Sequence, residues 1–167
     1  ERYERILTSE HALDFDDLLL IPLLLLKKNE ALRKFYQERW RYIHIDEFQD
    51  TNKVQYEFVK ILAGGHGNIC VVGDMDQTIY SWRGARATHI FLFEQDFPGT
   101  KVILLEENYR STKNIITAAN AVIENNTIRQ EKTLRSNKEA GDKIKIITMA
   151  DEKREAEFCV LECIQLL

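Results

Sequence analysis

The sequence predicts an α/β fold in which helices cover both faces of a parallel sheet. Four short apolar segments lack the polar alternation of half-buried strands, and helical patterns separate them. Ligands of such folds bind beyond the carboxyl ends of the strands, and polar clusters follow several of these segments. The four expected strands are residues 42–45, 69–72, 102–105 and 143–149.

The helices follow from apolar periodicity and from capping residues. A helix over 14–29 contains Pro22, which is expected to kink it, and a second helix covers 30–39. Asn52, with Gln55 three residues later, is the expected cap of a helix that Gly64 and Gly65 end. The remaining expected features are a helix over 87–95, a turn at Pro98-Gly99, a helix from Ser111 or Thr112 to about 125, and a last helix capped by Asp151.

Composition limits the classes of function. The 23 basic and 27 acidic residues give a net charge of −4, which argues against a broad nucleic-acid surface, so any such contact must be local. Three cysteines without zinc-ligand spacing or a signal peptide indicate a reducing compartment, and we expect a cytoplasmic protein. Cys159 and Cys163 are expected as small buried groups on a helix. The run over 18–26 is shorter than the roughly 20 residues that span a bilayer, so no membrane segment is expected.

The first chemical segment is IDEFQDT, residues 45–51. An apolar strand that ends in two acids is typical of a Walker B site. There Asp46 would hold Mg²⁺ and Glu47 would orient and deprotonate the attacking water. Strand-Asp-Glu alone is a weak signal, because acids often end strands where they are solvated. The full stretch, with Gln49 and Thr51, is more specific.

The second segment is VVGDMDQTIYSWRGA, residues 71–85. Gln77 lies just past a strand end, where its amide can contact a terminal phosphate. Tyr80, Trp82 and Arg83 follow, and nucleic-acid bases stack on such aromatic faces for about 1–3 kcal/mol each. The alternative is that Tyr80 and Trp82 are core residues. Their polar, glycine-bounded loop favours the stacking interpretation.

The third segment is LEENYRST, residues 105–112. Arg110 follows an expected strand and opens a helix, so it could act as an arginine finger on a transferring phosphoryl group. The alternative is a surface arginine paired with Glu106 or Glu107. Tyr109 offers a ring that can stack on adenine. A softer stretch, DFDDLL at 14–19, places acids where they suit a helix dipole.

Together these segments resemble the superfamily 1 DNA helicases of the Rep, UvrD and PcrA type. IDEFQDT is similar to the family's motif II, VVGDMDQTIYSWRGA to motif III and LEENYRST to motif IV. DFDDLL resembles the pattern ahead of motif II. AGDKIKIIT, residues 140–148, resembles the start of the second motor domain. The resemblance covers nearly the whole chain.

The resemblance implies a motor of two RecA-like domains that moves three-prime to five-prime on single-stranded DNA and unwinds duplex at junctions. Residues 1–107 would be the later part of the first domain, without its Walker A segment, and 108–167 the start of the second. ATP and Mg²⁺ would be the cofactors. The resemblance assigns Mg²⁺ to Asp46 and Glu47, the γ-phosphate to Gln77 and Arg110, adenine to Tyr109, and DNA to Tyr80, Trp82, Arg83 and Phe15.

The chain departs from the family in having no G-x-x-x-x-G-K-[ST] phosphate loop. It also begins at Glu1 without Met and stops at Leu167 inside an expected helix. We therefore expect an excised fragment that hydrolyses ATP negligibly alone, and whose cut sheet edges favour self-association. Two alternatives remain at this stage. One is a metal nuclease built on Asp46, Glu47, Asp50, Asp74 and Asp76, and the other is a degenerate, non-catalytic DNA-binding or scaffold module.

Overall fold

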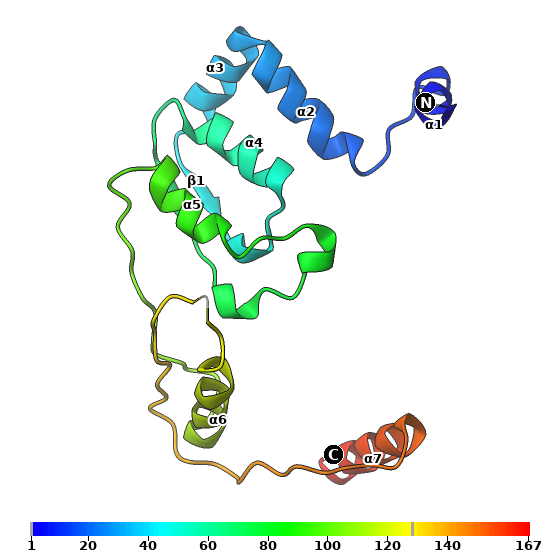
Figure 1. Cartoon of the computed structure of the whole chain (residues 1–167), viewed down its shortest axis with the longest axis vertical. Coiled ribbons are helices and arrows are strands. Elements are labelled where there is room, and N and C mark those ends of the chain that lie inside the picture. Colours follow the sequence, from blue (N-terminus) through cyan, green and yellow to red (C-terminus); the bar gives the residue numbers. More distant parts are fainter. Residues whose placement is uncertain (1, 128) are drawn as a thin grey trace. The chain divides into compact units, whose positions relative to one another are not determined.

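Two short parallel strands form the sheet in the computed structural model, which describes residues 2–127 and 129–167. The strands pair with Ile43 opposite Ile69 and Ile45 opposite Val71 (Figure 1). The elements are α1 (Arg2–Ser9), α2 (Asp17–Lys28), α3 (Glu30–Arg39), β1 (Ile43–Ile45), η1 (Phe48–Asp50), α4 (Lys53–Ala63), β2 (Ile69–Val71), η2 (Met75–Gln77), η3 (Ser81–Arg83), α5 (His89–Asp96), α6 (Lys113–Ile123) and α7 (Glu152–Gln165).

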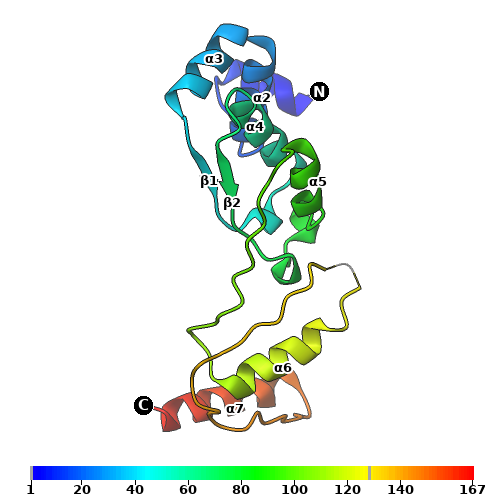
Figure 2. The same ribbon diagram turned by 90° about the vertical axis from the view of Figure 1, so that its left-hand side faces the viewer.

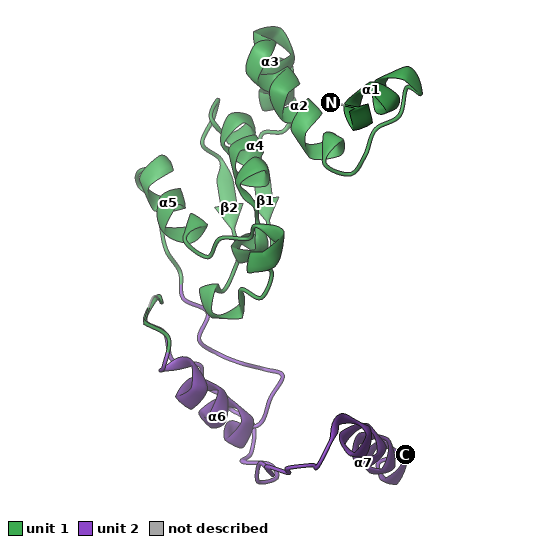
Figure 3. Cartoon of the chain, turned by 45° about the vertical axis from the view of Figure 1, so that its right-hand side comes forward, with its two compact units in different colours: residues 1–103, 126–131 green, residues 104–125, 132–167 purple. Residues whose placement is uncertain are grey.

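The chain forms two compact units, which Figure 3 colours separately. Unit 1 contains residues 1–103 and 126–131, and unit 2 contains residues 104–125 and 132–167. The sheet and helices α1 to α5 belong to unit 1, and helices α6 and α7 belong to unit 2. Among the described residues, no helix is both long and apolar enough to span a bilayer.

An aromatic cluster forms the core of unit 1 on one face of the sheet. The Phe48 ring is completely buried, and it meets Tyr56 of α4 and Phe93 of α5 edge to face at centroid distances of 5.8 and 5.6 Å. Ile45, Ile69 and Val71 pack against this cluster. Helices α4 and α5 thereby cover the sheet, and Figure 2 shows the strands beside them.

The prediction of helices on both faces of a larger sheet is wrong for the residues that the structure describes. His44 and Cys70, in the middle of each strand, are exposed on the opposite face. The α/β class itself is confirmed, as a helix-rich chain with a small parallel sheet.

The prediction of a strand is also wrong for two of the four expected segments. Residues 102–105 and 143–149 belong to no strand in the structure, and Ile103, Leu105 and Ile146 are largely exposed. A strand exists only where a neighbour pairs with its N–H and C=O groups. Apolar composition alone does not supply that neighbour.

Local signals predicted the helix termini well. Asn52 and Gln55 form the expected reciprocal capping box, and α4 ends at Gly64. The Asp151 side chain accepts a hydrogen bond from the Arg154 N–H at the start of α7. Helix α2 begins at Asp17, three residues later than expected, and includes Pro22. The expected burial of two cysteines on α7 is wrong, because this helix has no buried residue.

Unit 2 is organised around α6. An isolated parallel bridge joins Glu107 to Arg135, and the N–H of Asn108 donates to the Arg135 carbonyl at 2.7 Å. The buried Ser136 hydroxyl donates to the Ser111 carbonyl at 2.6 Å. These bonds hold the segment after Lys132 beside the start of α6.

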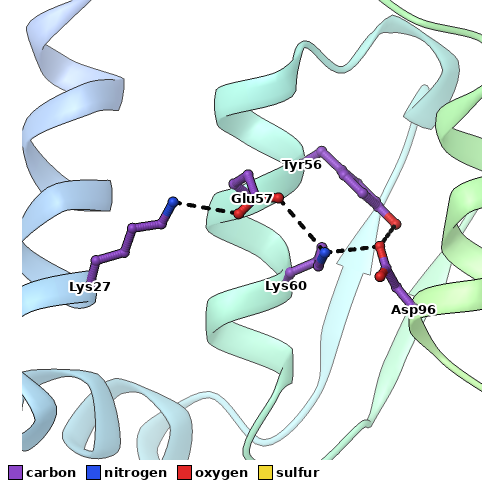
Figure 4. A network of polar contacts seen from close by, with 5 residues as sticks. All are labelled: Lys27, Tyr56, Glu57, Lys60 and Asp96. Atoms are coloured by element: carbon purple, nitrogen blue, oxygen red, sulfur yellow. Dashed lines mark hydrogen bonds and ion pairs between the residues drawn. The ribbon is translucent and has the colours of Figure 1, made fainter.

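Polar contacts connect α2, α4 and α5 at the surface of unit 1 (Figure 4). Glu57 lies between Lys27 and Lys60, at 3.5 and 3.7 Å, and Lys60 reaches Asp96 at 3.0 Å. The buried Tyr56 ring donates its hydroxyl hydrogen to Asp96 at 2.6 Å. Burial and this bond raise the pKa of Tyr56, and the bond also lowers the pKa of the Asp96 carboxyl.

We predict that Tyr56→Phe lowers the free energy of unfolding by about 1 kcal/mol at pH 7, since it removes a hydrogen bond to a carboxylate. Because the folded-state pKa of Asp96 is lowered, this contribution is present above the unfolded-state pKa of about 3.9 and is lost as the pH falls through the folded-state value. Urea unfolding at neutral and acid pH measures both effects. Tyr36→Phe is the control, and an equal loss in both variants would contradict the role of the Asp96 bond.

Candidate functional site

The chain turns sharply at the end of β1, where Asp46 and Glu47 lie. Glu47 adopts the left-handed conformation, with φ 49° and ψ 42°. This turn lets the N–H of Phe48 donate to the Val72 carbonyl at 2.9 Å while the Phe48 ring enters the core. Both acidic residues remain exposed. The carboxylate of Asp46 accepts a hydrogen bond from the Glu47 N–H at 2.9 Å.

A buried glutamine connects this turn to the end of β2. The Gln49 side chain is only 1% exposed. Its Nε2 donates to Glu47 Oε2 at 2.7 Å, and its Oε1 accepts from the Asp74 N–H at 3.0 Å. Gly73 leaves room for this amide, because a Cβ at Gly73 would lie 2.7 Å from Gln49 Oε1.

The same series of hydrogen bonds continues to Gln77. Asp74 caps the short helix η2 by accepting from the Asp76 N–H at 3.0 Å. Its second carboxylate oxygen accepts from Gln77 Nε2 at 2.8 Å. Gln77 itself is exposed. The structure therefore brings Glu47 and Gln77, expected from the sequence at two strand ends, into one series of hydrogen bonds through Gln49 and Asp74.

Two aromatic rings and a guanidinium follow in the next turn. Arg83 lies 4.5 Å from the Trp82 ring centroid and 5.4 Å from that of Tyr80, within cation–π range of both. Trp82 is 70% exposed and Tyr80 is 37% exposed. The alternative that Trp82 is a core residue is therefore wrong. Exposed rings of this kind are available to stack on planar ligands.

The two remaining predicted residues belong to unit 2. Tyr109 is exposed and donates its hydroxyl hydrogen to Glu107 at 2.7 Å, which raises the pKa of Tyr109. Arg110 is exposed in the bend that precedes α6, and the Asn108 side chain accepts from its N–H at 3.0 Å. Glu106 instead accepts from the Thr133 N–H at 2.9 Å. Within the described residues neither Glu106 nor Glu107 forms an ion pair with Arg110.

The donor set at β1 suits Mg²⁺ bound together with a nucleotide. Mg²⁺ keeps several waters and takes only one or two carboxylates besides substrate phosphates, and Asp46 presents an exposed carboxylate. Over residues 2–127 and 129–167, no three acidic, histidine or cysteine side chains gather as a protein-only metal site would require. The nuclease alternative, which needs such a cluster, finds no support in this geometry.

A groove of about 460 Å³ lies beside the two acids, between α2, α4 and the end of β1. Its walls are mostly apolar, and Asp46, Glu47 and Asp50 are among its lining residues.

Phe15, just before α2, is 89% exposed. The neighbouring acid Asp14 accepts a hydrogen bond at 2.9 Å from the N–H of Asp17, the first residue of α2. This bond lowers the pKa of Asp14.

Neither Gln49 nor Gly73 was expected from the sequence to have a role of its own. No spacing rule indicates that Gln49 is buried, because its partners, Glu47 and Asp74, follow two different strands. The available signal was Gly73, a glycine directly after a strand that indicates close packing against the backbone.

Comparison with known proteins gives a consistent result over both units. Residues 1–98 match the family model of the UvrD/REP helicase N-terminal domain, and residues 103–167 match that of the UvrD-like helicase C-terminal domain. The chain is 49% identical over 160 residues to ATP-dependent DNA helicase PcrA of Staphylococcus epidermidis, and 48% identical over 160 residues to the helicase of that name from Staphylococcus aureus. Each alignment covers 96% of this chain and 22% of the relative.

We predict that Gly73→Ala destabilises unit 1 by about 1–3 kcal/mol, because the added methyl overlaps the pinned Gln49 amide. Thermal or urea unfolding measures the change. Most of the cost should disappear when the methyl is added in a Gln49→Ala background, which removes the overlapping atom. An equal cost in both backgrounds would show that the overlap lies elsewhere.

Proposed function

This chain belongs to the UvrD-like DNA helicase family, and we propose that it is a section of an ATP-driven motor that moves three-prime to five-prime on single-stranded DNA and unwinds duplex at junctions. The chain spans 22% of the length of the curated relatives that it matches. Residues 1–107 would be the later part of a first RecA-like domain, and residues 108–167 the start of a second. The intact protein would perform the activity.

The hydrogen-bonded series from Glu47 to Gln77 carries this proposal. Hydrolysis of ATP needs a group that receives a proton from water and a group that contacts the terminal phosphate. Here two suitable side chains project from neighbouring strand ends and share a continuous set of hydrogen bonds. The stacking residues begin three positions after Gln77, so the same segment serves phosphate and base contacts.

The residues divide the chemistry between them. Asp46 would hold Mg²⁺, which neutralises charge on the phosphates when bound. Glu47 would orient the attacking water and accept its proton. Gln77 would donate to a γ-phosphate oxygen, and Arg110 would stabilise the negative charge that develops there. Tyr109 would stack on the adenine.

The bases of DNA would stack on Tyr80 and Trp82, with Arg83 supplying a positive charge that suits the backbone. Stacking is independent of base identity, as translocation along any sequence requires. The net charge of −4 is compatible with such a local contact. A non-catalytic scaffold would need none of the catalytic residues, and the next experiment separates it from a motor.

We predict that Glu47→Gln in the full-length helicase lowers DNA-stimulated ATP hydrolysis by about 10²-fold or more, since an amide cannot accept the proton. Nucleotide binding, measured with a fluorescent ATP analogue, should persist. Glu57→Gln on α4 is the matched control and should hydrolyse ATP normally. Normal ATP turnover by Glu47→Gln would refute the role of Glu47. If the wild-type protein hydrolyses no ATP, the non-catalytic scaffold becomes the better interpretation.

We predict that Trp82→Ala weakens binding of an oligothymidine by about 1–3 kcal/mol, the value of one stacked base. Thermal stability should hold, because the ring is mostly exposed. Fluorescence anisotropy of labelled DNA measures the affinity, and Trp40→Ala serves as a control for loss of a surface indole. Unchanged affinity would remove Trp82 from the DNA contact.

A further inference from the structure

We propose that Gln49 is a positioning residue for ATP hydrolysis, which holds the Glu47 carboxylate and couples it to the segment that carries Gln77. The proposal rests on the function proposed above and adds a residue with no contact to substrate. Its basis is the placement of one buried side-chain amide between two strand ends.

The partners of Gln49 fix the orientation of its amide. The Asp74 N–H can only donate, so the atom that faces it at 3.0 Å must be the carbonyl oxygen. An ionised Glu47 carboxylate can only accept, so the atom that faces it at 2.7 Å must be the NH₂ group. A flipped amide would place two donors together at the Asp74 N–H and two acceptors together at the Glu47 carboxylate. Glu47 therefore receives a directed donor.

The surroundings prevent Gln49 from relaxing. Phe48, its neighbour in η1, is completely buried in the aromatic cluster. Gly73 packs so closely against the amide that a Cβ at this position would lie 2.7 Å from Gln49 Oε1. A buried amide without partners costs about 1–3 kcal/mol, so both bonds are expected to persist. The Glu47 side chain is thus held from inside the protein, although it is exposed.

The series also transmits displacement. Gln49 binds the backbone of Asp74, and the carboxylate of Asp74 holds the Gln77 side chain. When Gln77 changes partner to contact a phosphate, the Asp74 carboxylate loses its bond to Gln77, and Gln49 links the backbone of the same residue to Glu47. Water activation then depends on whether the terminal phosphate is present.

Variants in the full-length helicase separate the two bonds of Gln49. Gln49→Glu keeps an acceptor for the Asp74 N–H and replaces the amide donor with a carboxyl group, which disturbs Glu47 by repelling its charge or by sharing a proton with it. Gln49→Met removes both at similar volume. Gln37→Met is the matched control, because the partly buried Gln37 side chain also donates a hydrogen bond, here to the Ile61 carbonyl of α4 at 2.6 Å.

We expect Gln49→Glu and Gln49→Met to lower kcat for DNA-stimulated ATP hydrolysis by about 10–100-fold, as misplacement of a catalytic group does. The KM for ATP should change by less than about threefold, because Gln49 does not touch the nucleotide. Gln37→Met should retain wild-type kcat. A rise in KM with unchanged kcat, or normal kcat in Gln49→Glu, would overturn the proposal.

Amide hydrogen exchange at Asp74 tests the bridge without any activity. Exchange should accelerate by about tenfold or more in Gln49→Met and stay near the wild-type rate in Gln49→Glu. Unchanged exchange in Gln49→Met would mean that the bridge does not exist, and the proposal fails. If the wild type hydrolyses no ATP but shows the expected exchange pattern, the proposed function fails while the bridge stands.

Discussion

A buried amide has to satisfy both its donor and its acceptor, and this requirement at Gln49 organises the end of the sheet. The cost of an unpaired buried polar group is comparable to a substantial part of the stability of a small domain. The ends of β1 and β2 must therefore keep the spacing that lets one side chain reach Glu47 and the Asp74 backbone. Two neighbours maintain that spacing. Gly73 leaves room for the Gln49 amide, and the buried Phe48 ring anchors the turn after β1.

The sequence predicts features that neighbouring residues determine. The Asn52–Gln55 capping box, the Asp151 cap and the end of α4 at Gly64 all depend on contacts within a few positions, and the structure confirms them. Strands 102–105 and 143–149 were not predictable in this way, because a strand depends on a partner elsewhere in the protein. Apart from Met149, their apolar side chains are exposed in the structure.

The candidate site shows the same division. Motif spacing places Asp46 and Glu47 after one strand and Gln77 after the next, and the structure connects Glu47 and Gln77. Motif spacing could not reveal that the connection passes through Gln49, since that depends on tertiary contacts between the strand ends. The roles in hydrolysis and DNA binding stay proposals. They unite the hydrogen-bonded series with the stacking residues of the next turn.

The backbone of Glu47 has a further consequence. A non-glycine residue in the left-handed region costs of order 1–2 kcal/mol, and φ of 49° places Glu47 there. Glycine would adopt the same turn without that penalty. Glycine would also leave the buried NH₂ group of Gln49 without its acceptor, at a cost of about 1–3 kcal/mol, so the Gln49 bond offsets the backbone strain of the acid at this position.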